Sequence, residues 1–406
     1  MTIMKFFNSF LRASAALGFA AALATLSGCA AAPDLLLPAG RGSGDLGLVI
    51  ERESGTVGVL DTSARKVIGS IGGLGDLSHA SVVYGRDGAT AYVFGRDGAL
   101  TRVNLLTGRI EARVQQAGNS IGGAISTDGT LVVAQNYQPG GIKVFDAVTL
   151  KLLADIPAVV DGKPSRVVGL ADIARNRFIY ALFDAGQIWI ADLADPANPV
   201  LTRFNDIGKQ PYDALVTPDG RYYIAGLFGE DGLAKIDLWA AQPRVERILP
   251  GYGRGEQPLP VFKMPHLRGW TVAGRRAFLP AIGRHEVLVV DTDSWQEVGR
   301  IQVAGQPVFV MARPDGRQVW VNFAVPDYDS VQVIDTQTLQ IVHSLKPGKA
   351  VLHMEFTPRG EAVWISSRDA GHISVIDTQS FQTLAVLPAK SPSGIFFSSR
   401  AARTGF

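Results

Sequence analysis

The chain has 406 residues, of which 47% are hydrophobic and 19% are charged, and it contains 45 glycines. This composition fits a β-rich globular body with many turns and excludes a disordered chain. The formal net charge of +2 is too small to favour binding of nucleic acid through bulk charge. We therefore expect a folded protein and no nucleic acid among its partners.

The first 29 residues have the features of an export signal. Lys5 and Arg12 supply positive charge, and residues 13–26 form an apolar run that is shorter than the roughly 18 residues required to span a membrane as a helix. The Leu-Ser-Gly-Cys sequence that follows resembles a bacterial lipobox, which implies a lipoprotein signal peptide over residues 1–29 with lipidation at Cys29. The alternative is a signal that is cleaved without lipidation.

Cys29 is also the only cysteine in the chain, so the sequence predicts no disulfide and no thiolate metal site. The next residue is alanine rather than aspartate, which by resemblance to lipoprotein sorting favours a membrane anchor in the outer membrane and a body in the periplasm. Residues 30–45 are then a flexible tether between the lipid anchor and the folded body.

Short apolar segments that end in a polar residue recur along the rest of the chain. These polar residues are Asp61, Asn104, Asp146, Asp192, Asp237, Asp291, Asp335 and Asp377. They are spaced about 43 residues apart, and each repeat contains four strand-like segments separated by turns such as Pro-Asp-Gly. Four short strands in such a repeat are typical of one propeller blade.

The repeats predict an all-β fold, an eight-bladed β-propeller with four-stranded antiparallel blades over residues 46–398 and a C-terminal tail over 399–406. The apolar segment 394–398 can supply the innermost strand that the first blade lacks. We therefore expect the ring to be closed by N- and C-terminal strands, which removes free sheet edges. One repeat is longer, and its extra residues, 249–270, are either a functional insertion on one face or a surface loop.

Two kinds of connection lie at the same end of every blade: from the outer strand to the next inner strand, and between the second and third strands. Near the start of the inner strand, one position in the repeat carries His79, Tyr212 and His266, whereas most other blades have apolar residues there. Three ring side chains at the same position of the repeat, all near one channel, indicate a functional site. Tyr212 and His266 are the catalytic candidates for proton transfer. The alternative is that each is a hydrogen-bonded core residue.

The loop between the second and third strands carries an arginine in four of the repeats. These residues are Arg52, Arg96, Arg284 and Arg368. Arginine suits bidentate recognition of carboxylates, and a neutral imidazole such as that of His79 can be an axial ligand to iron. Together they predict an iron tetrapyrrole with several carboxylates as the ligand. The alternative for each arginine is a solvated surface residue.

Asp172 lies inside the apolar inner segment VVGLADIA. A buried carboxylate requires a partner or a raised pKa, and either fits acid–base catalysis, although a structural hydrogen-bond acceptor is the alternative. Several aromatic residues near the same loops either stack on a macrocycle or belong to the core; they are Tyr137, Phe228, Trp270, Phe323 and Tyr328.

Three segments resemble those of a known family. LSHASVVYGRDGATAYVFGRDGALTRVNL (77–105) resembles the haem d1 propeller of cytochrome cd1 nitrite reductase at the strand that carries the proximal histidine, which implies His79 as the haem iron ligand. IGKQPYDALVTPDGRYYIAG (207–226) resembles the segment that carries a distal histidine, with Tyr212 in its place, and KMPHLRGW (263–270) is also similar. With tyrosine there and no Cys-x-x-Cys-His sequence, the chain is not expected to reduce nitrite.

A lone propeller of this family with an export signal is similar to the periplasmic proteins of haem d1 biosynthesis. The resemblance implies an enzyme that binds a late tetrapyrrole precursor and helps convert it to (dihydro-)haem d1 by a redox or dehydrogenase-type step, for nitrite reductase in denitrification. His79 and the four arginines would hold the ligand, and Tyr212, His266 and Asp172 would transfer protons.

Two alternatives to the enzyme remain. One is a non-catalytic carrier that delivers haem d1 to cytochrome cd1 nitrite reductase, with other haem d1 maturation proteins as further partners. The other is a propeller that serves only as a scaffold. The sequence shows no Gly-x-Gly-x-x-Gly that follows a strand and opens a helix, which disfavours a NAD-dependent dehydrogenase.

Overall fold

The computed structural model describes residues 37, 40–252, 269–281 and 284–403, except for the side chain of residue 213. The chain divides into two compact units, Met1–Ala32 and Pro33–Phe406, and all described residues belong to the second. Within the described ranges, no helix is long and apolar enough to cross a membrane. The predicted signal peptide lies outside them.

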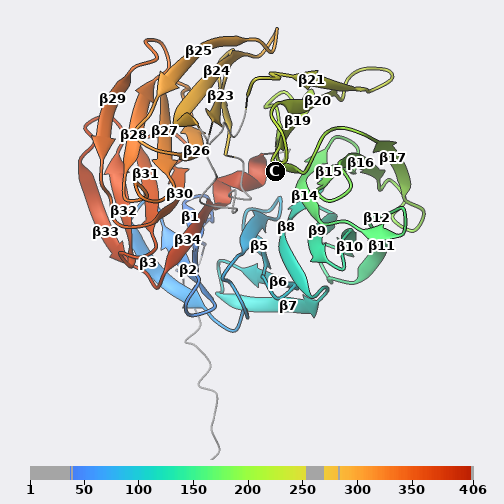
Figure 1. Ribbon diagram of the computed structural model, residues 1–406. Coiled ribbons are helices and arrows are strands. Elements are labelled where there is room, and N and C mark those ends of the chain that lie inside the picture. Colours follow the sequence, from blue (N-terminus) through green and yellow to red (C-terminus); the bar gives the residue numbers. More distant parts are fainter. Residues whose placement is uncertain (1–36, 38–39, 253–268, 282–283, 404–406) are drawn as a thin grey trace, which may run out of the picture. The chain divides into compact units, whose positions relative to one another are not determined.

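Eight four-stranded antiparallel sheets form the blades of a propeller (Figure 1). From the inner to the outer strand, blades 1 to 4 are β34 (Pro392–Phe397), β1 (Leu46–Glu51), β2 (Thr56–Asp61) and β3 (Lys66–Ile71); β4 (Ser81–Tyr84), β5 (Thr90–Phe94), β6 (Ala99–Asn104) and β7 (Arg109–Gln115); β8 (Asn119–Ile125), β9 (Leu131–Gln138), β10 (Ile142–Asp146) and β11 (Leu152–Ile156); and β14 (Val167–Ile173), β15 (Arg177–Leu182), β16 (Gln187–Asp192) and β17 (Val200–Phe204).

Blades 5 to 8 follow the same order along the chain. They are β18 (Pro211–Val216), β19 (Tyr222–Leu227), β20 (Leu233–Asp237) and β21 (Val245–Ile248); β22 (Thr271–Ala273), β23 (Arg276–Ala281), β24 (Glu286–Asp291) and β25 (Glu297–Gln302); β26 (Pro307–Ala312), β27 (Gln318–Phe323), β28 (Val331–Asp335) and β29 (Ile341–Leu345); and β30 (Val351–Phe356), β31 (Ala362–Ser367), β32 (His372–Asp377) and β33 (Thr383–Pro388). Two further short strands, β12 (Val159–Val160) and β13 (Lys163–Pro164), form a hairpin between blades 3 and 4.

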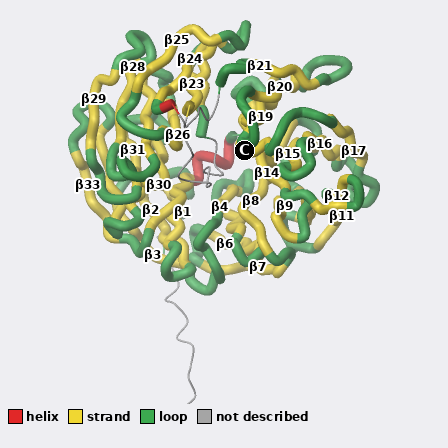
Figure 2. Tube along the Cα trace, viewed as in Figure 1, coloured by secondary structure: helices red, strands yellow, loops and turns green. Residues whose placement is uncertain are grey.

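The first and last strands of the propeller pair with each other in blade 1. β34 runs antiparallel to β1, with Phe397 opposite Gly47 and Ile395 opposite Val49. The predicted all-β, eight-bladed fold and its closure by N- and C-terminal strands are therefore confirmed. Figure 2 shows that strands make up most of the regular structure of the described residues.

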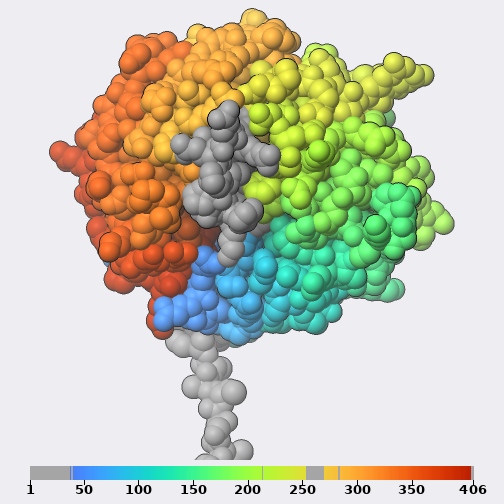
Figure 3. All heavy atoms as spheres, in the orientation of Figure 1, coloured from blue at the N-terminus to red at the C-terminus, as the bar shows by residue number. Residues whose placement is uncertain are grey.

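Burial differs between the strands of a blade in the way the sequence requires. Every residue of the second strand β5 (TAYVF) is buried, whereas every residue of the outer strand β7 (RIEARVQ) is exposed or partly buried. The second strand is covered on both faces by neighbouring blades, but the outer strand is in contact with solvent, so the charged residues are on the outer strand. The core accordingly lies between adjacent blades, which pack against one another in Figure 3.

The recurring aspartates have a structural role at the end of the third strand. In blade 3, Asp146 Oδ1 accepts hydrogen bonds from the backbone N of Val148 at 3.1 Å and of Thr149 at 2.7 Å. Asp335 makes the same bonds in blade 7, and the bond from the backbone N of Thr338 is the main cause that lowers its pKa. This Asx-type turn requires an aspartate or asparagine after the third strand, which explains why one of these two residues recurs at the end of each repeated segment.

A short 3₁₀ helix, η2 (Ser398–Ala402), follows β34 where a tail was predicted. Arg400 and Ala402 of η2 line the central channel, and the red coil at the centre of Figure 1 is this segment. Its position at the centre is physically reasonable because β34 is an innermost strand, so the chain that leaves it emerges beside the channel.

Candidate functional site

The two ends of the channel carry different connections. The front end is the end that carries the connections from the outer strand of one blade to the inner strand of the next, and from the second to the third strand within a blade. The back end carries the remaining turns. The sequence predicts the candidate site at the front end.

Three of the four predicted arginines come together on consecutive blades. Arg368, Arg52 and Arg96 lie in the second-to-third-strand turns of blades 8, 1 and 2. Burial and then the neighbouring guanidinium of Arg368 lower the pKa of Arg52, which shows that these two cations are close. Asp76 and Asp369 lie near Arg52 and balance part of the charge. Arg368 is also ion-paired with Asp369, at 2.5 Å between Nε and Oδ1. The three turns therefore gather guanidinium groups that can bond an anionic ligand, with part of their charge already balanced by these aspartates.

The loop that carries His79 is held between two of these arginine turns. The side chain of Arg52 donates a hydrogen bond to the carbonyl O of Ser78, and the backbone N of Arg96 donates to the carbonyl O of Asp76 at 2.8 Å. His79 itself is partly buried, just before β4. The structure therefore brings His79, Arg52 and Arg96 together at the front end, with a histidine flanked by cations.

Four aromatic side chains form a second group at the front end of blades 3 to 5. Tyr212 packs against Phe183 and Phe228, with ring centroids 5.7 Å and 5.9 Å apart. Its hydroxyl lies 3.4 Å from the hydroxyl of Tyr137. All four residues are at least partly buried, so they offer flat apolar surface with two hydroxyls in it.

The arginine group and the aromatic group are adjacent. The guanidinium of Arg96 lies 6.0 Å from the ring centroid of Tyr137, within the range of a cation–π contact. Together with His79, the two groups form one arc over blades 8, 1, 2, 3, 4 and 5, which we call the front arc. The name also covers the pair Arg166 and Asp184 on blade 4, because Arg166 lies against a ring of the aromatic group. A flat ligand with carboxylates needs such a combination of cations and aromatic faces.

The other predicted front-end residues have different positions. Arg284 is exposed in the corresponding turn of blade 6 and is not part of the front arc. His266 and Cys29 lie outside the described residues. Among the predicted aromatic residues, Phe323 is a core residue with 1% exposure, Trp270 is buried and lines the channel, and Tyr328 lies near Arg368.

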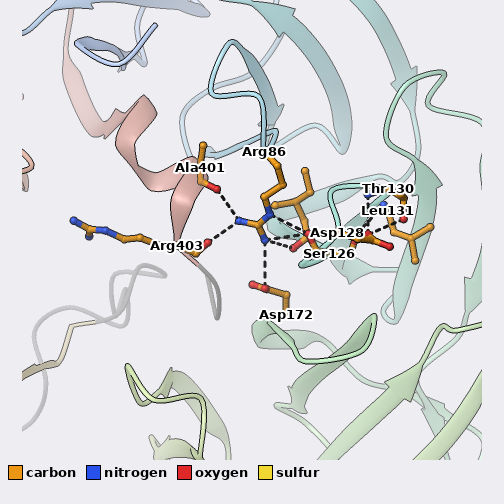
Figure 4. Close-up of polar contacts among 9 residues, drawn as sticks. Arg86, Ser126, Asp128, Thr130, Leu131, Asp172, Ala401 and Arg403 are labelled. Carbon is orange, nitrogen blue, oxygen red and sulfur yellow. Dashed lines mark hydrogen bonds and ion pairs between the residues drawn. The ribbon is translucent and has the colours of Figure 1, made fainter.

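Asp172 lies at the back end of its strand and is not brought together with His79 or Tyr212. Its side chain is 1% exposed and forms an ion pair with Nη2 of Arg86 at 3.5 Å. Figure 4 shows that the same guanidinium also donates to the carbonyl O of Ala401 at 3.0 Å and of Arg403 at 2.6 Å. These contacts agree with the structural alternative for Asp172, a hydrogen-bond acceptor, because its Oδ2 accepts from the Arg86 guanidinium that also bonds the C-terminal segment.

The channel contains a cavity of about 720 Å³, lined by the inner strands and by turns of the back end. Its wall is polar and apolar in about equal parts, and its buried polar residues include Gln135, His353 and Glu355. Burial lowers the pKa of His353 well below its ordinary value, so this imidazole is neutral. Its Nδ1 accepts a hydrogen bond from the backbone N of Ile395, which leaves His353 a structural role next to the closing strand.

Buried polar atoms at the front end test whether a ligand fits there. Oγ of Ser367, beside Arg368, and Oδ1 of Asn119, at the start of β8, are buried and have no hydrogen-bond partner within the described part of the chain. Such atoms are costly unless a partner satisfies them. Together with the cations and the aromatic faces of the front arc, they fit a ligand with polar groups at its edge.

Sequence reasoning missed one charged pair of the front arc, Arg166 and Asp184. Arg166 lies in an outer-to-inner connection, whereas arginines were sought only in the turns between second and third strands. Its guanidinium lies 4.2 Å from the ring centroid of Phe183. A search of both kinds of front-end connection would have found it.

These observations define a class of protein, a closed eight-bladed β-propeller with a cationic and aromatic ligand site at one end of its channel. Residues 41–401 match the family model described as the cytochrome D1 heme domain, and the chain belongs to this family. The resemblance and the ligand class predicted from the sequence, haem d1 or its precursor, are confirmed at this level.

Two curated relatives and one solved structure are similar to most of the chain. "Protein NirF" of Stutzerimonas stutzeri is 60% identical over 388 residues, which cover 95% of this chain and 98% of the relative. "Protein NirF" of Pseudomonas aeruginosa is 58% identical, with coverages of 94% and 97%. The structure of the dihydro-heme d1 dehydrogenase NirN in complex with DHE aligns with a TM-score of 0.77 and 27% identity over 90% of this chain and 78% of that one. Family and relatives support a role in haem d1 biosynthesis or maturation.

Proposed function

We propose that the protein binds a late haem d1 precursor at the front arc and helps to convert it to (dihydro-)haem d1. The observation that carries this proposal is the position of His79, whose loop is fixed between the turns of Arg52 and Arg96 with Arg368 beside them. An iron tetrapyrrole with several carboxylates requires an imidazole that can ligate the iron and guanidinium groups that can bond the carboxylates.

Different residues of the front arc would bind different parts of the ligand. Arg52, Arg96 and Arg368 would hold carboxylates, His79 would ligate the iron, and the aromatic group would lie against the ring. When bound, the tetrapyrrole supplies the conjugated system and the metal on which redox chemistry takes place. The protein would orient the ligand, and the aromatic group would exclude water from the side of the ligand that lies against it.

Tyr212 is the described residue best placed to move a proton in this reaction. Its hydroxyl faces that of Tyr137 within the front arc. His266 remains a second candidate from the sequence. Asp172 is not retained, because its ion pair with Arg86 lies at the back end. The name of the structural relative, a dehydrogenase in complex with a ligand, supports a redox step on a related molecule.

A second candidate function is a carrier that delivers haem d1 to cytochrome cd1 nitrite reductase, together with other maturation proteins. One observation favours it. Asp172 lies at the back end, so Tyr212 is the only predicted acid–base residue in the described part of the front arc. The front arc thus has the groups for binding a ligand but few groups for acid–base catalysis. We also propose that Cys29 is lipidated and anchors the protein at the outer membrane, with its body in the periplasm.

An anaerobic time course distinguishes enzyme from carrier. The purified protein is mixed with the late precursor that it is proposed to convert or with haem d1, and absorption spectra are recorded over time with and without an added electron acceptor. A complex whose spectrum changes to that of a new macrocycle supports the enzyme, and a complex whose spectrum stays constant in all mixtures supports the carrier. If neither tetrapyrrole binds, both functions are wrong and only the scaffold remains.

A further inference from the structure

Arg166 is held in one orientation by Asp184 at the front end of blade 4. Its Nε donates to Oδ2 of Asp184 at 3.0 Å, its Nη2 donates to Oδ1 at 2.5 Å, and its backbone N donates to Oδ2 at 2.9 Å. Hydrogen bonding to Asp184 raises the pKa of Arg166. A planar guanidinium that is bonded through two N–H groups has little freedom left to lose. Arg166 is therefore rigid although its side chain is 43% exposed.

The guanidinium of Arg166 faces the aromatic group of the front arc. Its Cζ lies 4.2 Å from the ring centroid of Phe183 and 6.0 Å from that of Tyr137. Phe183 in turn packs edge-on against Tyr212 at an interplanar angle of 76°. One cation thus contacts Tyr137 directly and supports Tyr212 through Phe183.

The two tyrosine hydroxyls form a pair whose chemistry depends on this support. Oη of Tyr137 and Oη of Tyr212 are 3.4 Å apart, and either can be the donor. A bond between two hydroxyls uses one proton, so the second is directed towards another acceptor. A nearby positive charge favours the ionised form of an acidic group and so makes the hydroxyl a stronger donor.

We propose that Arg166 is a positioning residue for the ligand: clamped by Asp184, it fixes the Tyr137–Tyr212 pair so that one hydroxyl donates a hydrogen bond to an oxygen atom of the bound tetrapyrrole. This inference rests on the proposed function, because it requires that haem d1 or its precursor binds at the front arc. It adds a residue that acts through others and does not itself touch the ligand.

A double-mutant cycle on the full-length protein tests the coupling. Affinity for haem d1 and the absorption maxima of the complex are measured for the wild type, Arg166→Ala, Tyr212→Phe and the double variant. We expect each single change to weaken binding about tenfold and to shift the maxima in the same direction. The double variant should lose no more than about tenfold in total, because both changes remove the same hydrogen bond.

Two further variants separate positioning from charge and from general damage. Arg166→Lys keeps the charge but cannot make the two bonds to Asp184, so it should behave like Arg166→Ala. Arg203→Ala is the matched control, because Arg203 lies over Trp189 at 4.5 Å in the outer part of blade 4, and it should bind as the wild type does.

The outcomes are distinguishable. Additive losses of about a hundredfold in the double variant, or wild-type affinity and absorption maxima in Arg166→Ala, would overturn the inference while the proposed function stands. A wild-type protein that does not bind haem d1 would overturn both. Circular dichroism tests whether each variant is folded. If Arg166→Ala does not fold, Asp184→Asn provides a second way to release the Arg166 side chain.

Discussion

At the scale of single residues, the front arc depends on neighbours that the repeat phase alone does not reveal. The phase located arginines in the correct kind of turn, but only those of blades 8, 1 and 2 are adjacent, and Arg284 of blade 6 stands apart. The position of a residue within the repeat shows at which end of its blade the residue lies, but it does not show which residues of neighbouring blades lie beside it. For Asp172, hydrophobicity indicated an inner strand but not which end of it meets Arg86.

Arg52 gives the residue-scale prediction for ligand binding. Replacing it in the variant Arg52→Ala should weaken binding of haem d1 about tenfold, because a charge-assisted bond to a carboxylate is lost. Titration monitored by absorption measures the effect. Arg317→Ala, an exposed arginine in a back-end turn, is the control and should bind normally. Equal affinity in both variants would mean that Arg52 does not contact the ligand.

At the scale of elements, η2 and β34 hold several blades together at the back end. Arg400 of η2 forms two bonds with Glu355 of β30, Nε to Oε1 at 2.7 Å and Nη2 to Oε2 at 2.5 Å, and Glu355 is only 5% exposed. The guanidinium of Arg400 also lies 5.0 Å from the ring centroid of Phe396 in β34. The sequence predicted the closing strand but described the residues after it as a tail, because a five-residue 3₁₀ helix has no periodicity to detect.

Breaking the pair of η2 and β30 should destabilise the protein strongly. Arg400→Met leaves Glu355 buried without its partner, which should lower the free energy of unfolding by about 3–5 kcal/mol. Urea unfolding followed by circular dichroism measures it. Adding Glu355→Gln should recover part of the loss, since the buried charge is then gone. A single variant as stable as the wild type would show that the pair is not formed in solution.

The contact of His353 with β34 predicts a dependence of stability on pH. Burial, with a smaller effect of Arg400, lowers the pKa of His353 well below 6.5, its ordinary value. Above pH 6.5 the imidazole is neutral in both states, whereas below it only the unfolded state binds a proton. Stability should therefore fall as the pH drops below 6.5, by up to about 1.4 kcal/mol per pH unit from this group.

His353→Gln provides the comparison for this pH effect. Urea midpoints of the wild type and the variant are measured from pH 7 towards pH 5 (about the range in which an ordinary histidine titrates). The wild type should lose stability more steeply than His353→Gln over this interval. Parallel profiles would contradict a neutral, buried His353.

At the scale of the whole molecule, the sequence predicted the architecture better than the site. Each blade has the same pattern of apolar inner strands and an Asx-type turn after the third strand. One such pattern is weak evidence for a blade, but eight of them at a regular spacing together predict the propeller. The site has no such repetition: it consists of residues that differ from blade to blade, such as His79, Tyr212 and Arg166. Residues on different blades come together only when the ring closes. Arg166 and Asp184, which both belong to blade 4, were missed for another reason: arginines were sought only in the turns between second and third strands.

The most direct test of the function concerns His79 in the assembled complex with its ligand. Haem d1 is titrated anaerobically into the wild type, His79→Ala and the control His343→Ala, whose ring stacks on Phe381 on the outer side of the propeller. We predict that the wild type and the control form the same complex with an axially ligated iron, and that His79→Ala loses this spectrum and binds more weakly. Identical spectra and affinities for all three proteins, or no binding by the wild type, would contradict a haem d1 site at the front arc.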